Sequence, residues 1–183
     1  EETGSEHFGQ ITSDPEVAKA LADSVGVILP VAWQGEDGSV EIHLGAKGVA
    51  EIQLVADGAR SGRGPGMEIH SMNAARVENP AWRLVKALDT LVADDGVTPT
   101  IDGWMDEVRP LSAGHIALID AGLRPEAEAG LKKNLKVQGW IAGEDYRTSL
   151  VRLASQPTVN IQGLVSGYTG PGGKTSMPSR AEA

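Results

Sequence analysis

Apolar residues in this chain change their spacing twice along its length. Between residues 40 and 56 they alternate with polar residues, which is the period of a β-strand. The spacing is helical over 79–92 and, with interruptions, over 105–153, with a brief extended piece over 97–101 between them. After residue 158 the alternation returns. Strands that flank a block of helices in this segregated order predict an α+β fold rather than an all-helical one.

Capping residues mark where the helices begin. Asn79-Pro80 combines a capping side chain with a proline at the first helical position, and Ser13-Asp14-Pro15 does the same for a helix over 15–23. Further helices are predicted over 112–121, 125–135 and 145–154, and strands over 25–31, 158–168 and 174–183. The two alternating runs within 40–56 predict a long strand that bends at Gly45 and Gly48. Residues 59–66 (Ala-Arg-Ser-Gly-Arg-Gly-Pro-Gly) predict a mobile loop without regular structure.

Composition removes several classes of function. With 16 Lys plus Arg against 25 Asp plus Glu, the net charge is −9, so phosphate-rich partners such as nucleic acid or an anionic membrane are not expected. Cysteine is absent, which excludes disulfides, thiolate zinc sites and a cysteine nucleophile. The longest apolar run, over 25–33, is too short to span a membrane. The cytoplasm is the default expectation for location.

Two features could carry chemistry. Glu1 and Glu2 are adjacent carboxylates, which can divide labour at a metal or lie on a solvated surface. His70 follows the glycine-rich segment and precedes the Asn79 helix, where it could project from an arm into a site. Gly173-Lys174-Thr175 is not the end of a phosphate-binding loop, because Tyr168 stands where that loop needs glycine.

Several segments together resemble metallopeptidase family twenty, the zinc enzymes that include carnosine dipeptidases, aminoacylases, glutamate carboxypeptidase and succinyl-diaminopimelate desuccinylase. The matching segments run in the family's order: Glu1-Glu2-Thr3-Gly4-Ser5, Ile69-His70-Ser71, Asn79-Pro80-Ala81-Trp82-Arg83-Leu84, Asp102 to Arg109, Thr158-Val159-Asn160-Ile161, Ser166-Gly167-Tyr168 and Lys174-Thr175-x-x-Pro178. The resemblance covers nearly the whole chain.

The resemblance implies a fragment of a two-domain hydrolase. Residues 1–38 would be the end of the first catalytic segment, a short helix-strand piece of an α/β domain. Residues 39–183 would be a lid that also dimerises, a two-layer α/β sandwich of βαββαβ order that stops in its third strand. The partners implied are a second copy of the chain and a small peptide or N-acyl amino acid as substrate.

The same resemblance implies roles for individual residues. Glu1 would be the general base at a site holding two zinc ions, and Glu2 would ligate one of them. His70 would reach into the partner subunit's active site, where it would stabilise the oxyanion or hold the substrate. Gly167 and Thr175 would contact the substrate near its carboxylate end.

Three interpretations stay open at this point. The parent protein could be an active zinc-dependent dipeptidase, carboxypeptidase or deacylase, in which this fragment alone is inactive. It could instead be a non-catalytic relative whose lid is a dimerisation or binding module, because Leu29-Pro30 stands where the family has an aspartate ligand. A free-standing α+β binding domain is the third, and the Glu1-Glu2 pair would then be incidental.

Overall fold

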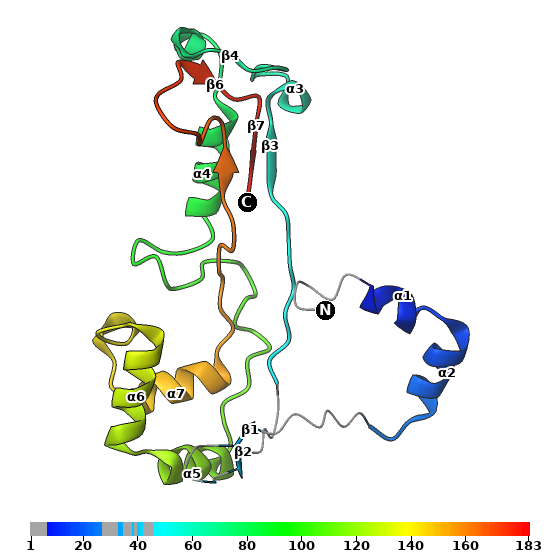
Figure 1. Cartoon of the computed structure of the whole chain (residues 1–183), viewed down its shortest axis with the longest axis vertical. Coiled ribbons are helices and arrows are strands. Elements are labelled where there is room, and N and C mark those ends of the chain that lie inside the picture. Colours follow the sequence, from blue (N-terminus) through cyan, green and yellow to red (C-terminus); the bar gives the residue numbers. More distant parts are fainter. Residues whose placement is uncertain (1–6, 27–32, 35–37, 39, 42–45) are drawn as a thin grey trace. The chain divides into compact units, whose positions relative to one another are not determined.

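The computed structural model describes residues 7–26, 33–34, 38, 40–41 and 46–183. The chain divides into two compact units, Glu1–Ala46 and Lys47–Ala183. Figure 1 traces both units along the chain. The boundary expected from the sequence, between residues 38 and 39, lies close to this division, and the assignment of the two parts to a catalytic domain and a lid stays a prediction.

The first unit holds two helices and a two-stranded ladder among its described residues. Helix α1 covers Phe8–Thr12 and α2 covers Pro15–Asp23. The Asp14 carboxylate accepts the Glu16 and Val17 backbone N–H groups at 2.9 and 3.2 Å, as the predicted cap requires. Strands β1 (Trp33–Gln34) and β2 (Val40–Glu41) pair antiparallel. The strand predicted over 25–31 does not include Val25 or Gly26, and its remainder lies outside the described residues.

The second unit is built around a three-stranded antiparallel sheet of order β3-β7-β5. Its strands are β3 (Val55–Asp57), β5 (Val165–Ser166) and β7 (Arg180–Glu182), and β7 is the central one. Leu54 and Ala183 exchange two further backbone hydrogen bonds, at 2.8 and 3.0 Å, beyond the last assigned pair. The strand predicted over 158–168 is present only as β5. The single strand predicted over 174–183 is wrong, because that segment is divided into β6 (Ser176–Met177), which pairs with β4 (Ile69–His70) in another sheet, and β7. Each ladder ends where its partner strand ends.

Helix α4 (Pro80–Asp89) packs against β3 and β7. The Asn79 side chain accepts the Ala81 N–H at 2.9 Å, which confirms the predicted start. Leu84 on this helix, Met177 and Ala181 are 1–2% exposed, and Pro80 at the start of the helix is buried as well. The core of this unit therefore lies between α4 and the sheet.

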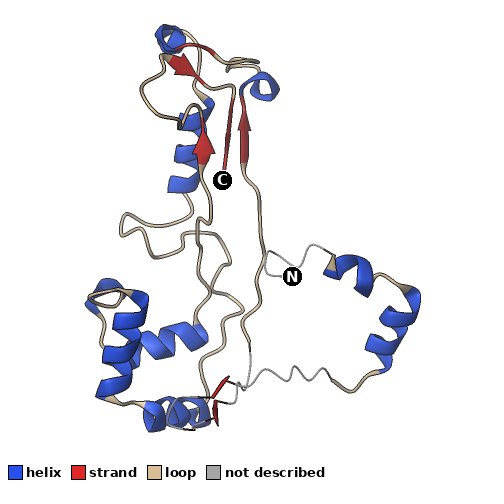
Figure 2. Ribbon diagram, in the orientation of Figure 1, coloured by secondary structure: helices blue, strands red, loops and turns tan. Residues whose placement is uncertain are grey.

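Three further helices follow in sequence: α5 (Ala113–Gly122), α6 (Pro125–Leu135) and α7 (Tyr146–Ser155), with the 3₁₀ turn η2 (Ile141–Gly143) before α7. Their bounds agree with the sequence prediction to within one residue. Helices α5 and α7 are in contact, and Arg147 of α7 bonds Asp120 of α5 at 2.5 Å. Figure 2 shows these helices and the short strands of the unit, which confirms the α+β class. None of the helices described is long and apolar enough to cross a membrane.

Residues 58–66 differ from their prediction as an irregular loop. Gly58–Ser61 form a short helix, α3, because the Asp57 side chain accepts the Arg60 N–H at 2.9 Å and Gly62 ends the turn at a φ of 68°. The next glycines then fold back, and the Gly64 N–H donates to the Gly58 carbonyl at 3.2 Å. A local cap and a glycine contact thus order a segment whose composition alone suggests none.

Gly58 should tolerate no side chain at this contact. A Cβ built there would lie 2.4 Å from the Pro65 carbonyl oxygen, which is backbone and cannot rotate away. We expect Gly58→Ala to lower the free energy of unfolding by about 1–3 kcal/mol, as overpacking does. Gly66→Ala is the matched control, because its Cβ would meet only the Ala59 side chain at 3.6 Å. Urea unfolding that gives equal midpoints for the two variants would contradict the close approach.

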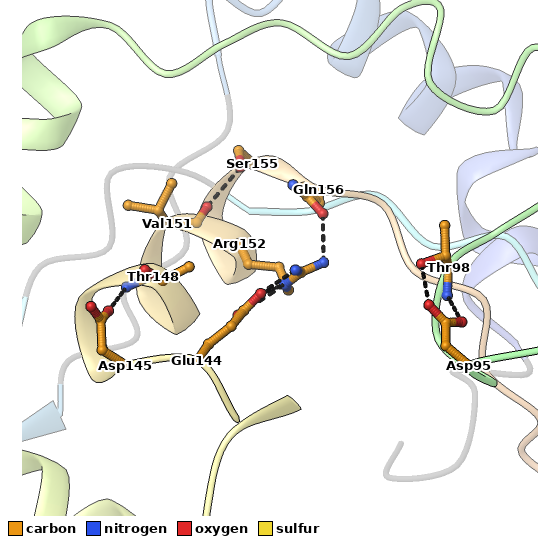
Figure 3. Close-up of polar contacts among 9 residues, drawn as sticks. All are labelled: Asp95, Thr98, Glu144, Asp145, Thr148, Val151, Arg152, Ser155 and Gln156. Carbon is orange, nitrogen blue, oxygen red and sulfur yellow. Dashed lines mark hydrogen bonds and ion pairs between the residues drawn. The ribbon is translucent and has the colours of Figure 1, made fainter. Parts of the chain in front are cut away.

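An arginine joins α7 to the segment before it (Figure 3). Arg152 Nε donates to both carboxylate oxygens of Glu144, at 2.9 and 3.1 Å, and Arg152 Nη1 donates to Gln156 at 3.0 Å. The hydrogen bond from Arg152 is the main reason that the pKa of Glu144 lies below its ordinary value of 4.5. This carboxylate therefore stabilises the folded chain only while it is ionised.

Acid should weaken this part of the fold through Glu144. Because its pKa is lower in the folded state, its contribution is present above about pH 4.5, the unfolded value, and is lost as pH falls through the folded pKa. We expect Arg152→Met to be less sensitive to acid than the unaltered chain when urea midpoints are compared at about pH 6 and about pH 3. Lys133→Met serves as a control for the loss of one cation. Equal acid sensitivity in Arg152→Met and the unaltered chain would mean that carboxylates other than Glu144 cause the loss of stability at low pH.

Candidate functional site

His70 ends strand β4 (Ile69–His70), which pairs antiparallel with β6 (Ser176–Met177). Figure 1 shows the two strands side by side, and in their register His70 lies opposite Ser176 while Ile69 lies opposite the buried Met177. The alternation of a strand places the Met177 side chain in the core and leaves His70 exposed. The buried Met177 thus fixes the strand pair that carries the exposed His70 imidazole.

The His70 ring is oriented by the backbone that follows it. Its Nδ1 accepts the Met72 N–H at 3.1 Å, at the start of the 3₁₀ turn η1 (Ser71–Ala75). A neutral imidazole that accepts at Nδ1 carries its proton on Nε2. The exposed face of this ring therefore offers an N–H donor, which is what a developing oxyanion or a substrate oxygen requires.

Thr175 lies opposite Ser71, the residue that follows His70. The Ser71 N–H donates to the Thr175 carbonyl at 3.1 Å, and Thr175 is exposed. The sequence separates His70 and Thr175 by more than a hundred residues, and the β4–β6 pair brings their backbones near each other. Because neighbouring positions alternate between the two faces of a strand, this register does not place both side chains on one face, and their shared role in a site stays a prediction.

Gly167 begins the loop that leads to Thr175. It follows β5 at a φ of 66°, and a Cβ built there would lie 3.7 Å from the Pro178 ring. Within the loop, the Tyr168 hydroxyl donates to the Pro171 carbonyl at 2.9 Å, so the ring folds back over its own segment. The left-handed backbone at Gly167 is what turns the chain from β5 into this loop.

An ion pair that the sequence analysis did not single out joins this loop to β4. Lys174 pairs with Glu68, and its Nζ lies 5.7 Å from the centre of the Tyr168 ring. The hydrogen bond from Lys174 is the largest cause that lowers the pKa of Glu68, and Ser176 adds a weaker one. Glu68 immediately precedes β4, and no spacing pattern in the sequence signals its contact with Lys174.

The predicted metal residues Glu1 and Glu2 lie outside the described residues, as does the Leu29-Pro30 segment. Among the described residues, no three His, Asp or Glu side chains gather closely enough to hold a metal ion. A catalytic zinc site takes three protein ligands, so the described residues by themselves do not supply one.

Comparison with known proteins gives relatives of one kind, although no family model matches the chain. The chain is 29% identical over 182 residues to the Cys-Gly metallodipeptidase dug1 of Schizosaccharomyces pombe. It is similar to the M20 family metallo-carboxypeptidase Sso-CP2 from Sulfolobus solfataricus, with a TM-score of 0.59 and 34% identity over 71% of this chain. Human carnosine dipeptidase 1 matches 63% of this chain with a TM-score of 0.53 and 25% identity. The di-peptidase Dug1p from Saccharomyces cerevisiae shares the fold, with a TM-score of 0.57 at 22% identity.

The homologues and structural neighbours of this chain are thus hydrolases, and specifically metallopeptidases. They are the M20 metallopeptidases that the sequence motifs resemble, so that resemblance is confirmed. Such relatives imply a metal cofactor. The match is partial: the chain covers 36% of the curated dipeptidase and 31% of Sso-CP2.

Proposed function

We propose that this chain is the lid-bearing part of a zinc-dependent hydrolase that cleaves a peptide or amide bond in a dipeptide or an N-acyl amino acid. The observation that carries the proposal is the exposed His70, whose Nδ1 accepts the Met72 N–H and leaves Nε2 as the donor, in a chain whose relatives are metallodipeptidases and a metallo-carboxypeptidase. A donor at this position can bind the carbonyl oxygen of a substrate. The cytoplasmic location stays an expectation within this proposal.

The proposed residues divide into those that act at the metal ions and those that contact the substrate. When bound, two zinc ions would supply a water that ionises near neutral pH and would polarise the substrate carbonyl. Glu2 would hold one ion, and Glu1 would take the proton from the nucleophile and pass it to the leaving amine. His70 would donate from Nε2 to the carbonyl oxygen, and Gly167 and Thr175 would line the carboxylate end of the substrate.

The test uses the full-length protein. We expect it to bind two equivalents of zinc, to hydrolyse dipeptides or N-acyl amino acids, and to lose hydrolysis on chelation and regain it with zinc. No tight zinc binding and no hydrolysis would overturn the proposal. That result would favour the non-catalytic dimerisation or binding module, to which the Leu29-Pro30 segment already points.

The proposal includes a homodimer formed through the lid. Helix α4 exposes Trp82 and Val85, at 68% and 42%, and β3 and β5 are the edges of the described three-stranded sheet. Tryptophan is a frequent hot spot, so we expect Trp82→Glu to weaken self-association by about 30-fold or more in sedimentation equilibrium. Leu118→Glu, on the exposed face of α5, is the control. A full-length protein that is monomeric at high concentration would contradict the dimer.

A further inference from the structure

Lys174 makes side-chain contacts with two segments that are far apart in the sequence. Its ammonium pairs with Glu68, which leads into the strand that carries His70. The same ammonium lies 5.7 Å from the Tyr168 ring, within the distance of a cation–π contact. Lys174 therefore touches both the glycine-rich loop 167–173 and the residue that immediately precedes the His70 strand.

The loop side of this contact is itself well defined. The Tyr168 hydroxyl bonds the Pro171 carbonyl at 2.9 Å. The ring lies so close to Gly170 that a Cβ there would be 2.5 Å from the hydroxyl oxygen. The ring and the loop backbone thus form one unit, and a cation held against the ring is held against the loop.

The strand side has few other tethers. Strands β4 and β6 pair over two residues each, and the Ser71 N–H to Thr175 carbonyl bond extends this short ladder. A two-residue ladder is marginal by itself, so side-chain contacts across it count for more than they would in a long sheet. Glu68 and Lys174 are 45% and 48% exposed, yet they are the charged pair that bridges the ladder and the loop.

We propose that Lys174 is a positioning residue, which clamps loop 167–173 to the segment that leads into β4 and so holds His70 in place beside that loop. The role rests on the proposed hydrolytic function, since it concerns the alignment of that site. An exposed ion pair alone contributes little to stability. Its effect here is on geometry, because a small displacement of a substrate-contacting group lowers turnover strongly.

The experiment compares Lys174→Met with Arg147→Met in the full-length protein. Arg147 is the matched control, because its pair with Asp120 is equally exposed, at 47% and 44%, and joins α5 to α7. In Lys174→Met we expect hydrogen exchange at the Ser71 amide to quicken about threefold to fivefold. We also expect kcat/KM to fall at least about tenfold.

Arg147→Met should change neither the Ser71 exchange rate nor kcat/KM. Lys174→Arg should restore most of the loss in both quantities. Glu68→Gln, which removes a charge with almost no change of shape, should reproduce the effects should Lys174→Met fold poorly.

The outcomes separate this proposal from the proposed function. Unchanged Ser71 exchange in both Lys174→Met and Glu68→Gln overturns the clamp, whatever the enzyme does. Faster exchange with unaltered kcat/KM in an active enzyme also overturns the positioning role. Faster exchange in a full-length protein that hydrolyses nothing supports the clamp between loop and strand while removing the proposed function.

Discussion

Replacing His70 with alanine should lower kcat/KM of the full-length protein by about 10²- to 10³-fold, the usual effect of removing one oxyanion donor. The side chain is exposed, and its one described bond is to the Met72 N–H, so the fold should lose little. We expect the melting temperature to change only slightly, because the lost bond is comparable to a helix cap, worth about 1 kcal/mol. Steady-state kinetics with dipeptide substrates measure the first effect and calorimetry the second.

Two controls separate the imidazole from the cap. His70→Asn keeps a side-chain oxygen that can accept the Met72 N–H but removes the Nε2 donor, so it should be as slow as the alanine variant. His115→Ala removes an exposed histidine from α5, where it contacts Ser112 at 3.1 Å, and should leave the rate unchanged. An unaltered rate in both His70 variants would remove His70 from the site.

A mixing experiment tests whether His70 acts in the partner subunit. When His70→Ala and Glu1→Gln chains are co-expressed, half of the dimers should contain one of each. In such a dimer, one of the two sites receives an intact Glu1 from its own chain and an intact His70 from the other. We therefore expect about a quarter of the unaltered activity, although each variant alone is nearly inactive. No recovery would place His70 in its own subunit's site or in none.

The helix boundaries were predictable because they depend on local chemistry. Asp14-Pro15 and Asn79-Pro80 each supply a capping oxygen and a proline at the first helical position, and the structure begins helices at both places. Strand lengths were not predictable in the same way. The alternating pattern begins at residue 52, but β7 provides strand pairing only for Val55–Asp57, so only these three residues are assigned to a strand.

The segment 58–66 shows a second limit. Its glycines and proline suggest disorder when taken singly, whereas the structure uses two of them in a contact. Gly58 and Gly64 can approach because neither carries a Cβ, and a Cβ at Gly64 would lie 2.7 Å from the Gly58 Cα. Spacing patterns do not report such a contact, because it depends on where the chain returns.

The candidate site comes from the sequence mainly through the family resemblance, and its residues stay predictions. Short motifs named His70, Thr175 and Gly167, and the pairing of β4 with β6 brings the backbones of the first two near each other. The link between Glu68 and Lys174 was missed because it joins distant residues through side chains, without a local pattern. The roles of Glu1 and Glu2 remain predictions, since both lie outside the described residues.

Leu84→Ala should be the most damaging of the substitutions considered for the Lys47–Ala183 unit. Leu84 is 2% exposed on α4, which packs on β3 and β7, and Ala181 at the centre of β7 is 1% exposed. We expect a loss of about 2–5 kcal/mol in the free energy of unfolding, because truncation removes buried methyl groups and leaves a cavity. A unit with a small hydrophobic core has a small free energy of unfolding, so a loss of this size should leave much of the unit unfolded at 37 °C.

Leu153→Ala is the matched control, since it removes the same atoms from a side chain that is 64% exposed on α7. It should change the free energy of unfolding by no more than about 0.5 kcal/mol. Urea unfolding followed by circular dichroism measures both variants, and comparable losses in the two would mean that α4 and the sheet do not form the core. The result also bears on the site, because β6 carries the buried Met177 opposite Ile69 and leads directly into β7. A core that fails at Leu84 should therefore also release the β4 strand, and with it the imidazole of His70.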